Sequence, residues 1–225
     1  MTESFFKRPL FYAAACFFTI FTVLSVFVSI ITATSDLATT LGSLLPSVAL
    51  FGCTSYALWL TIFQPFRGLS LLKTMAAILM VISALFAGAV IVSLCMILFG
   101  NSEMALMMST IAGMDAVMAL GPVAVLLIVA ALAAILLCFC AGARKLSASL
   151  QRGLERGLPS SGGALLAAVP GLFLALLLLA AAVFTLSAVP SASVLGALYL
   201  FSAAFALLSF SGIAFDCRRF GNTLA

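Results

Sequence analysis

The chain has 225 residues, of which 65% are hydrophobic and only 7% are charged, and it contains no His. Soluble globular domains carry about 25% charged residues, so this composition excludes an ordinary water-soluble protein and indicates apolar surface that faces lipid. The lack of His excludes His-ligated zinc, bis-His haem and a Ser-His-Asp triad. Because the apolar runs are long and continuous rather than alternating, they predict membrane-spanning helices and not a barrel.

Six apolar runs are each long enough to cross roughly 30 Å of hydrocarbon as a helix. In chain order they cover residues 9–33, 44–63, 74–99, 121–143, 164–186 and 192–215. The first run exceeds the roughly 7–15 apolar residues of a signal peptide, so we expect it to be retained as a span. The sequence therefore predicts an all-α, polytopic integral membrane protein: a single membrane domain, residues 1–225, with six transmembrane helices.

All ten Lys and Arg residues fall in regions that six spans place on one side of the membrane. These regions are the N-terminus, the second and fourth connections, and the C-terminal tail. The cations are Lys7, Arg8, Arg67, Lys73, Arg144, Lys145, Arg152, Arg156, Arg218 and Arg219. Because short cytoplasmic loops collect Lys and Arg, we predict that both termini are cytoplasmic, in a bacterial cytoplasmic membrane. The same charges predict contact with anionic lipid headgroups and require no nucleic-acid partner.

The third connection, residues 100–120, is too apolar for an ordinary loop. It contains the five methionines Met104, Met107, Met108, Met114 and Met118. Methionine suits irregular apolar packing, so we expect a re-entrant or interfacial helix that packs on the bundle. No metal or cofactor is predicted for it.

Residues 143–158 have the pattern of an amphipathic helix on the cytoplasmic surface, between the fourth and fifth spans. Leucine recurs at every fourth position and forms an apolar stripe, at Leu146, Leu150, Leu154 and Leu158. Three cations share another flank, at Lys145, Arg152 and Arg156. We expect the leucines to lie in acyl chains and the cations among lipid headgroups. The alternative is a docking helix for a cytoplasmic protein partner.

Pro170 and Gly171 lie well inside the fifth span. Proline removes a helical hydrogen bond, so we predict a kink there. Carbonyl oxygens freed at such a break can line a substrate path in transporters. The alternative is a packing kink, because Ala167, Gly171 and Ala175 form a ridge of small residues that lets a neighbouring helix approach closely.

The six runs contain no Asp, Glu, Lys, Arg, His, Asn or Gln. Ionisable groups inside a membrane mark proton relays and ion paths, so we expect none here. The chain also lacks a glycine-rich phosphate loop, which argues against nucleotide hydrolysis. We therefore predict a protein that is not an enzyme, with no catalytic, cofactor-binding or metal-binding residues.

Two functional interpretations stay open. The first is a small permease, or the membrane subunit of a transporter, for an uncharged or apolar substrate; the charge-free spans favour it, and Pro170 and Gly171 are its candidate path residues. The alternative is a non-catalytic membrane scaffold, anchor or assembly subunit of a larger complex. Near-uniform apolarity fits that alternative equally well, with Lys145, Arg152 and Arg156 as candidate contacts to a protein or lipid partner.

Overall fold

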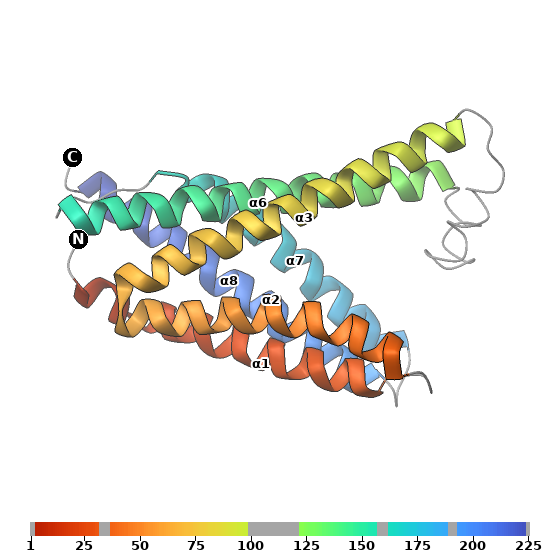
Figure 1. Ribbon diagram of the computed structural model, residues 1–225, viewed down its shortest axis with the longest axis horizontal. Helices are drawn as coiled ribbons and strands as arrows, with labels where there is room; N and C mark the ends of the chain where they lie inside the picture. The colour runs from red at the N-terminus through yellow and green to blue at the C-terminus, as the bar shows by residue number, and fades with distance from the viewer. Residues whose placement is uncertain (1–2, 32–36, 99–121, 157–161, 189–192, 224–225) are drawn as a thin grey trace. The chain divides into compact units, whose positions relative to one another are not determined.

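The computed structural model describes residues 3–31, 37–98, 122–156, 162–188 and 193–223, and these residues are helical almost throughout. Six α-helices and one short 3-10 helix make up the described chain (Figure 1). In order they are η1 (Glu3–Lys7), α1 (Pro9–Ile31), α2 (Leu37–Phe63), α3 (Pro65–Leu98), α6 (Pro122–Arg156), α7 (Ala164–Ala188) and α8 (Ser193–Thr223). The all-α prediction is confirmed. The predicted interfacial segment over residues 100–120 lies outside the described residues.

Five of the described helices are long and apolar enough to cross a membrane, namely α1, α3, α6, α7 and α8. α2 adds a shorter apolar stretch, Val48–Phe63. Much of this apolar surface is exposed, and in the most apolar window of α3 only 17% of the residues are buried. Helices with so much exposed apolar surface would be insoluble in water. They suit the hydrocarbon core of a bilayer, where the helix surface does not require polar side chains. The fold is that of an integral, multi-pass membrane protein.

The chain consists of two compact units. Unit 1 comprises residues 1–77 and 139–225, and unit 2 comprises residues 78–138, so the division cuts through α3 and α6. In unit 1, α1 packs against α2 on one side and α8 on the other, and α7 packs against α8 (Figure 1). That the whole chain is a single membrane domain stays a prediction.

α6 runs without a break from Pro122 to Arg156, so the predicted separate helix over residues 143–158 is instead the last part of α6. The leucine stripe also differs from its prediction. Leu146 and Leu150 are only 1% and 3% exposed, and they lie in the core of unit 1 rather than in acyl chains. Residues 157 and 158 lie outside the described chain. α6 continues to Arg156 because no proline interrupts it. The buried leucines of the stripe are covered by other parts of unit 1 and not by lipid.

Candidate functional site

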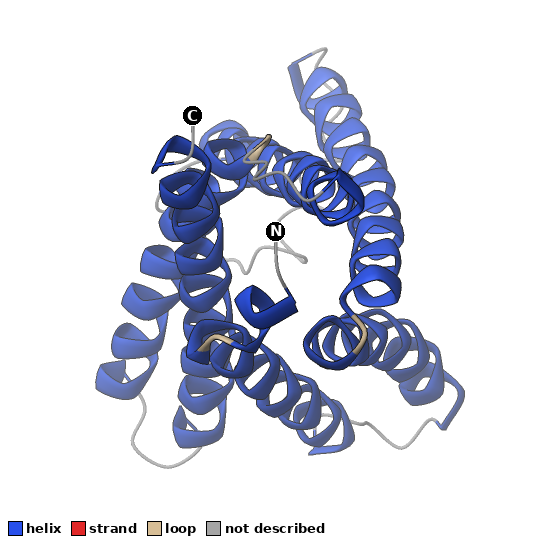
Figure 2. Ribbon diagram, turned by 90° about the vertical axis from the view of Figure 1, so that its left-hand side faces the viewer, coloured by secondary structure: helices blue, strands red, loops and turns tan. Residues whose placement is uncertain are grey.

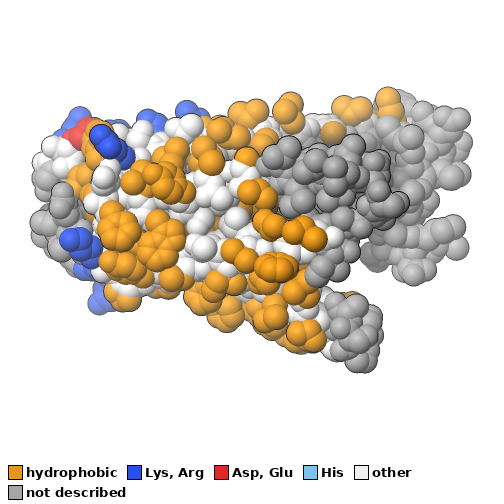
Figure 3. Space-filling view, turned by 60° about the horizontal axis from the view of Figure 1, so that its bottom comes forward, with side chains coloured by type: hydrophobic (Ala, Val, Ile, Leu, Met, Phe, Trp, Pro, Cys, Tyr) orange, Lys and Arg blue, Asp and Glu red, His pale blue; other side chains and the backbone are white. Residues whose placement is uncertain are grey.

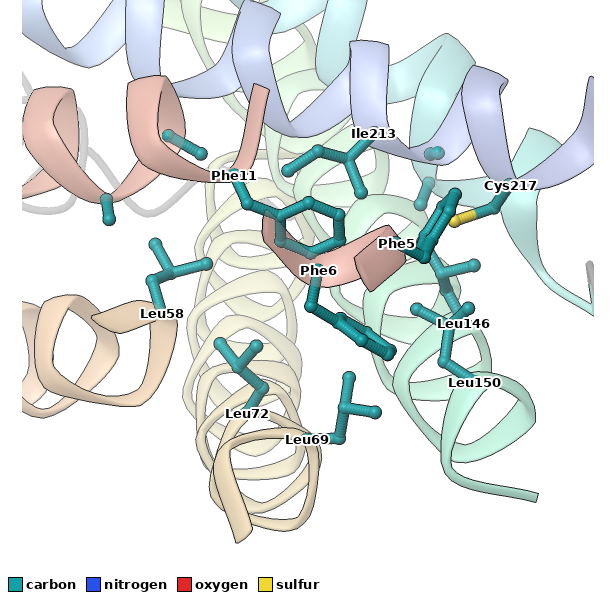
Figure 4. Close-up of a cluster of buried hydrophobic side chains, with 14 of the residues drawn as sticks. Phe5, Phe6, Phe11, Leu58, Leu69, Leu72, Leu146, Leu150, Ile213 and Cys217 are labelled. Carbon is teal, nitrogen blue, oxygen red and sulfur yellow. The ribbon is translucent and has the colours of Figure 1, made fainter. Parts of the chain in front are cut away.

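The helix ends that carry the cations meet around η1. Figure 2 looks onto this end of unit 1, and η1 lies among the surrounding helix ends. Two phenylalanines of η1, Phe5 and Phe6, are buried, the second completely. Figure 4 shows them among side chains of α1, α2, α3, α6 and α8: Phe11, Leu58, Leu69, Leu72, Leu146, Leu150, Ile213 and Cys217. We call the part of this cluster formed by Leu69, Leu72, Leu146, Leu150 and Cys217 the apolar socket.

This cluster gathers the four regions that contain the cations of the sequence. The N-terminal segment, the start of α3, the end of α6 and the end of α8 all contribute to it. In Figure 3 the Lys and Arg side chains on the visible face gather at this end, whereas apolar side chains cover the helices away from it. One end of unit 1 is therefore basic outside and aromatic inside.

An ion pair joins the two ends of the chain. Arg8 Nη1 lies 3.5 Å from Asp216 Oδ2, and the two side chains are 35% and 34% exposed. The Arg8 guanidinium also lies over the Phe5 ring, 4.9 Å from its centroid. A pair this exposed contributes at most about 1 kcal/mol. Burial of a phenylalanine contributes about 1.5–3 kcal/mol. The two rings therefore hold η1 more strongly than the charge does.

The three cations predicted as contacts, Lys145, Arg152 and Arg156, are all exposed. They lie on the side of α6 away from its buried leucines. Arg152 Nε donates a hydrogen bond to the carbonyl oxygen of Ala148, at 3.2 Å, which holds its side chain along the helix. This part of α6 thus presents cations outward and packs leucines inward, an arrangement that suits contact with anionic groups.

The turn before α7 packs onto the same part of α6. Gly163 has φ +83°, a left-handed conformation that side chains disfavour, and a Cβ there would lie 2.6 Å from the Cβ of Lys145. The Ser149 hydroxyl lies 3.0 Å from the carbonyl oxygen of Gly162. α6 and α7 are therefore fixed against each other next to the exposed cations.

Gly171 is buried where α7 meets α6 and α8. A Cβ at Gly171 would lie 2.6 Å from Ser211 Oγ and 2.9 Å from the ring of Phe139. The flanking small residues of the ridge, Ala167 and Ala175, are completely buried. The ridge is thus a packing surface, and neighbouring side chains fill the space beside Gly171.

Pro170 cannot donate the hydrogen bond that the Leu166 carbonyl would normally accept. Gly142 of α6 covers that carbonyl: a Cβ on Gly142 would lie 2.5 Å from the Leu166 oxygen. Since glycine carries only hydrogen in that position, the backbones of α6 and α7 can approach each other this closely. α7 continues past Pro170 as one helix, Ala164–Ala188, and the carbonyl that Pro170 leaves without its usual donor lies against a neighbouring helix.

Ser211 is a residue that the sequence did not single out. Among the buried side-chain nitrogen and oxygen atoms of the described residues, its Oγ is the one without a hydrogen-bond partner. Several other hydroxyls in the spans bond to their own helix, as Thr54 does to the carbonyl oxygen of Leu50 at 2.7 Å. Nothing in the sequence distinguishes Ser211 from the many other serines. The lack of a hydrogen-bond partner for its Oγ depends on its neighbours in space, Gly171 and Phe139.

In the part of the chain that the structure describes, acidic and thiol side chains do not cluster as a metal site would require. No group of three His, Cys, Asp or Glu in the described part of the chain could hold a metal ion. Cys140 and Cys217 are buried, whereas Cys138 is exposed. That the protein has no metal and no catalytic residues stays a prediction.

No protein-family model matches the chain, and no curated protein and no solved structure matches it either. What the protein does must therefore follow from its own residues: a basic end closed by η1, a tightly packed helix contact beside Pro170, and exposed cations on α6.

Proposed function

We propose that the protein is a non-catalytic membrane scaffold, anchor or assembly subunit of a larger complex. The observation that carries this proposal is the packing at Gly171. Ser211 and Phe139 fill the space where a substrate path was expected, and Gly142 covers the freed carbonyl of Leu166. Close approach of helices through small residues is the means by which membrane helices associate. A chain with this packing acts through contacts between membrane helices.

The proposed topology has six spans with both termini in the cytoplasm, in the cytoplasmic membrane of a bacterium. It is supported by the meeting of the N-terminal segment and the ends of α6 and α8 in one cluster, because alternating spans require these regions to share a side. The cations gathered there point to the cytoplasmic side, since Lys and Arg accumulate in short cytoplasmic loops.

The exposed cations of α6 are the proposed contact with other molecules. Lys145, Arg152 and Arg156 face outward beside a turn that is fixed onto the helix, so their positions are set by the fold. A rigid basic face attracts both anionic lipid headgroups and an acidic surface of a cytoplasmic protein. We propose that it binds the complex to which this subunit belongs.

Purification of the tagged protein from its own membranes in mild detergent tests this role. We expect a partner protein at constant stoichiometry, and we expect Arg152→Gln with Arg156→Gln to reduce its recovery several-fold. The matched control is Arg67→Gln with Lys73→Gln, which removes two other exposed cations from the same end of unit 1. Recovery of the chain with lipid alone, or equal loss of the partner from both double variants, would contradict the proposal.

A second function, a small permease for an uncharged or apolar substrate, is favoured by one observation. Ser211 Oγ is buried beside Gly171 without a hydrogen-bond partner, and such a group is costly unless something uses it. A shift of α7 at Pro170 would open this hydroxyl to an uncharged solute. The proposed path residues are then Pro170, Gly171 and Ser211.

Proteoliposomes test the permease directly. Their shrinkage and recovery in glycerol or xylitol, followed by light scattering, should be faster than that of protein-free liposomes. Ser211→Ala should slow the recovery, whereas Ser93→Ala should not, because Ser93 is on α3 and donates its hydroxyl to the carbonyl oxygen of Ala89. Equal rates with and without protein would exclude this function for these solutes.

A further inference from the structure

η1 is attached to unit 1 differently from every described α-helix there. It has five residues, too few for a helix that is stable by itself. A single residue, Arg8, separates it from α1. Its two phenylalanines and the Arg8–Asp216 pair hold it in place. In contrast, α1 packs against α2 and α8, and α7 packs against α8, over much longer stretches of helix. η1 is therefore the element of this end that can leave without unfolding a span.

We propose that η1 is a detachable strap: Phe5 and Phe6 close the apolar socket, the Arg8–Asp216 pair fastens the closure, and release of η1 opens the socket to its surroundings. Cys217 lines the socket next to Phe5, and its side chain is 1% exposed when the strap is in place (Figure 4). Release would therefore expose a thiol that is otherwise covered.

The Arg8–Asp216 ion pair is accessible to other molecules. About a third of each side chain of the pair is exposed, so salt and charged groups reach both partners. Anionic lipid headgroups compete with Asp216 for Arg8, and a basic partner competes with Arg8 for Asp216. Any ligand that binds the open form better than the closed form shifts the balance toward opening. Such a strap would regulate a scaffold and a permease alike.

Thiol labelling of Cys217 measures the opening. The other five cysteines are replaced by Ala, and the purified protein in detergent is treated with N-ethylmaleimide and followed by mass spectrometry. Arg8→Gln leaves both phenylalanines in place but removes the fastening. Loss of a partly exposed ion pair should change the equilibrium between attached and released η1 by roughly two- to fivefold. Cys217 should therefore react with N-ethylmaleimide about two- to fivefold faster in this variant. Asp216→Asn should act in the same direction.

Two controls separate strap release from other effects. Lys7→Gln removes an equal charge from an exposed neighbour of Arg8 and should leave the rate unchanged. The second control is a protein in which Cys140 is the single cysteine. Cys140 is buried in unit 1 but does not belong to the cluster around η1. Arg8→Gln should therefore not change the rate at which N-ethylmaleimide labels Cys140. The proposal is overturned if Arg8→Gln and Lys7→Gln give the same rate at Cys217. It is equally overturned if Cys140 accelerates as much as Cys217, because the whole unit then loosens.

Discussion

Arg8 and Asp216 form an ion pair across 208 positions of sequence, with Arg8 Nη1 3.5 Å from Asp216 Oδ2. The pair links the segment before α1 to the end of α8. Asp216 is followed closely in sequence by Arg218 and Arg219, so the sequence alone does not indicate that Arg8 is the residue it pairs with. The pairing is testable by exchanging the two charges.

Exchange of the charges should rescue what each single substitution loses. Arg8→Asp and Asp216→Arg each place like charges together, and each should lower the free energy of unfolding by about 1 kcal/mol. The double variant restores opposite charges and should recover most of the loss. Melting temperatures in detergent for the four proteins give the coupling energy. Additive losses in the double variant would show that the two side chains do not interact.

A methyl group added at Gly171 should destabilise unit 1. Gly171→Ala places a carbon against Ser211 and the ring of Phe139, which belong to two other helices. Overpacking of this kind costs about 1–3 kcal/mol. A lower melting temperature and reduced recovery of the folded protein from membranes are therefore expected.

Gly88→Ala is the matched control, since a Cβ at Gly88 would have nothing within 4 Å. Alanine favours a helix by up to about 1 kcal/mol over glycine, so this variant should be as stable as the parent or slightly more so. If Gly171→Ala matched it, the packing that supports the scaffold function would be refuted.

Hydropathy predicted the helices well because a membrane helix satisfies its own backbone hydrogen bonds, and its apolar length is a local property. The run 164–186 corresponds to α7, Ala164–Ala188. Hydropathy did not locate every helix end. α3 begins at Pro65, before Arg67 and Lys73, because a helix continues past the point where its residues become polar.

The partner of an apolar stripe could not be predicted from the sequence. The period of Leu146, Leu150 and Leu154 shows that one face is apolar, but lipid and a phenylalanine ring are equally acceptable neighbours for leucine. Here the first two of these leucines pack in the cluster that holds η1. The same ambiguity applies to Gly171, since a substrate path and a packed helix contact both call for small residues. Which of them is present depends on Phe139 and Ser211, residues on other helices.

Removal of the Phe6 ring should be among the most costly single changes in the chain. Phe6 is completely buried among leucines of α3 and α6, so Phe6→Ala should cost about 3–5 kcal/mol. Phe27→Ala removes the same ring from α1 at a position that is 56% exposed, and it should have little effect on the free energy of unfolding. Denaturant titration in detergent compares the two variants. Equal stability of the two would mean that η1 does not occupy the cluster.

A polar contact between α1 and α2 gives the last prediction. Trp59 Nε1 donates to Thr19 Oγ1 at 3.0 Å, and Thr19 Oγ1 lies 2.7 Å from Ser55 Oγ. Thr19 also donates to the carbonyl oxygen of Ala15 at 2.7 Å, so its oxygen serves three groups on two helices. Thr19→Val keeps the shape of the side chain but leaves the indole N–H without its acceptor. Hydrogen bonds between membrane helices contribute about 0.5–2 kcal/mol, and a loss of that size is expected.

Trp59 is the one tryptophan of the chain, so tryptophan fluorescence reports on the surroundings of this indole. In Thr19→Val the emission should shift, because the indole loses its hydrogen-bond partner, and the melting temperature should fall. Thr74→Val is the control: Thr74 is exposed on α3 and bonds to the carbonyl oxygen of Ser70, within its own helix. It should change neither the emission nor the melting temperature. An unaltered emission in Thr19→Val would place the indole away from Thr19 and remove the polar link between α1 and α2, leaving their aromatic and aliphatic contacts to hold the pair together.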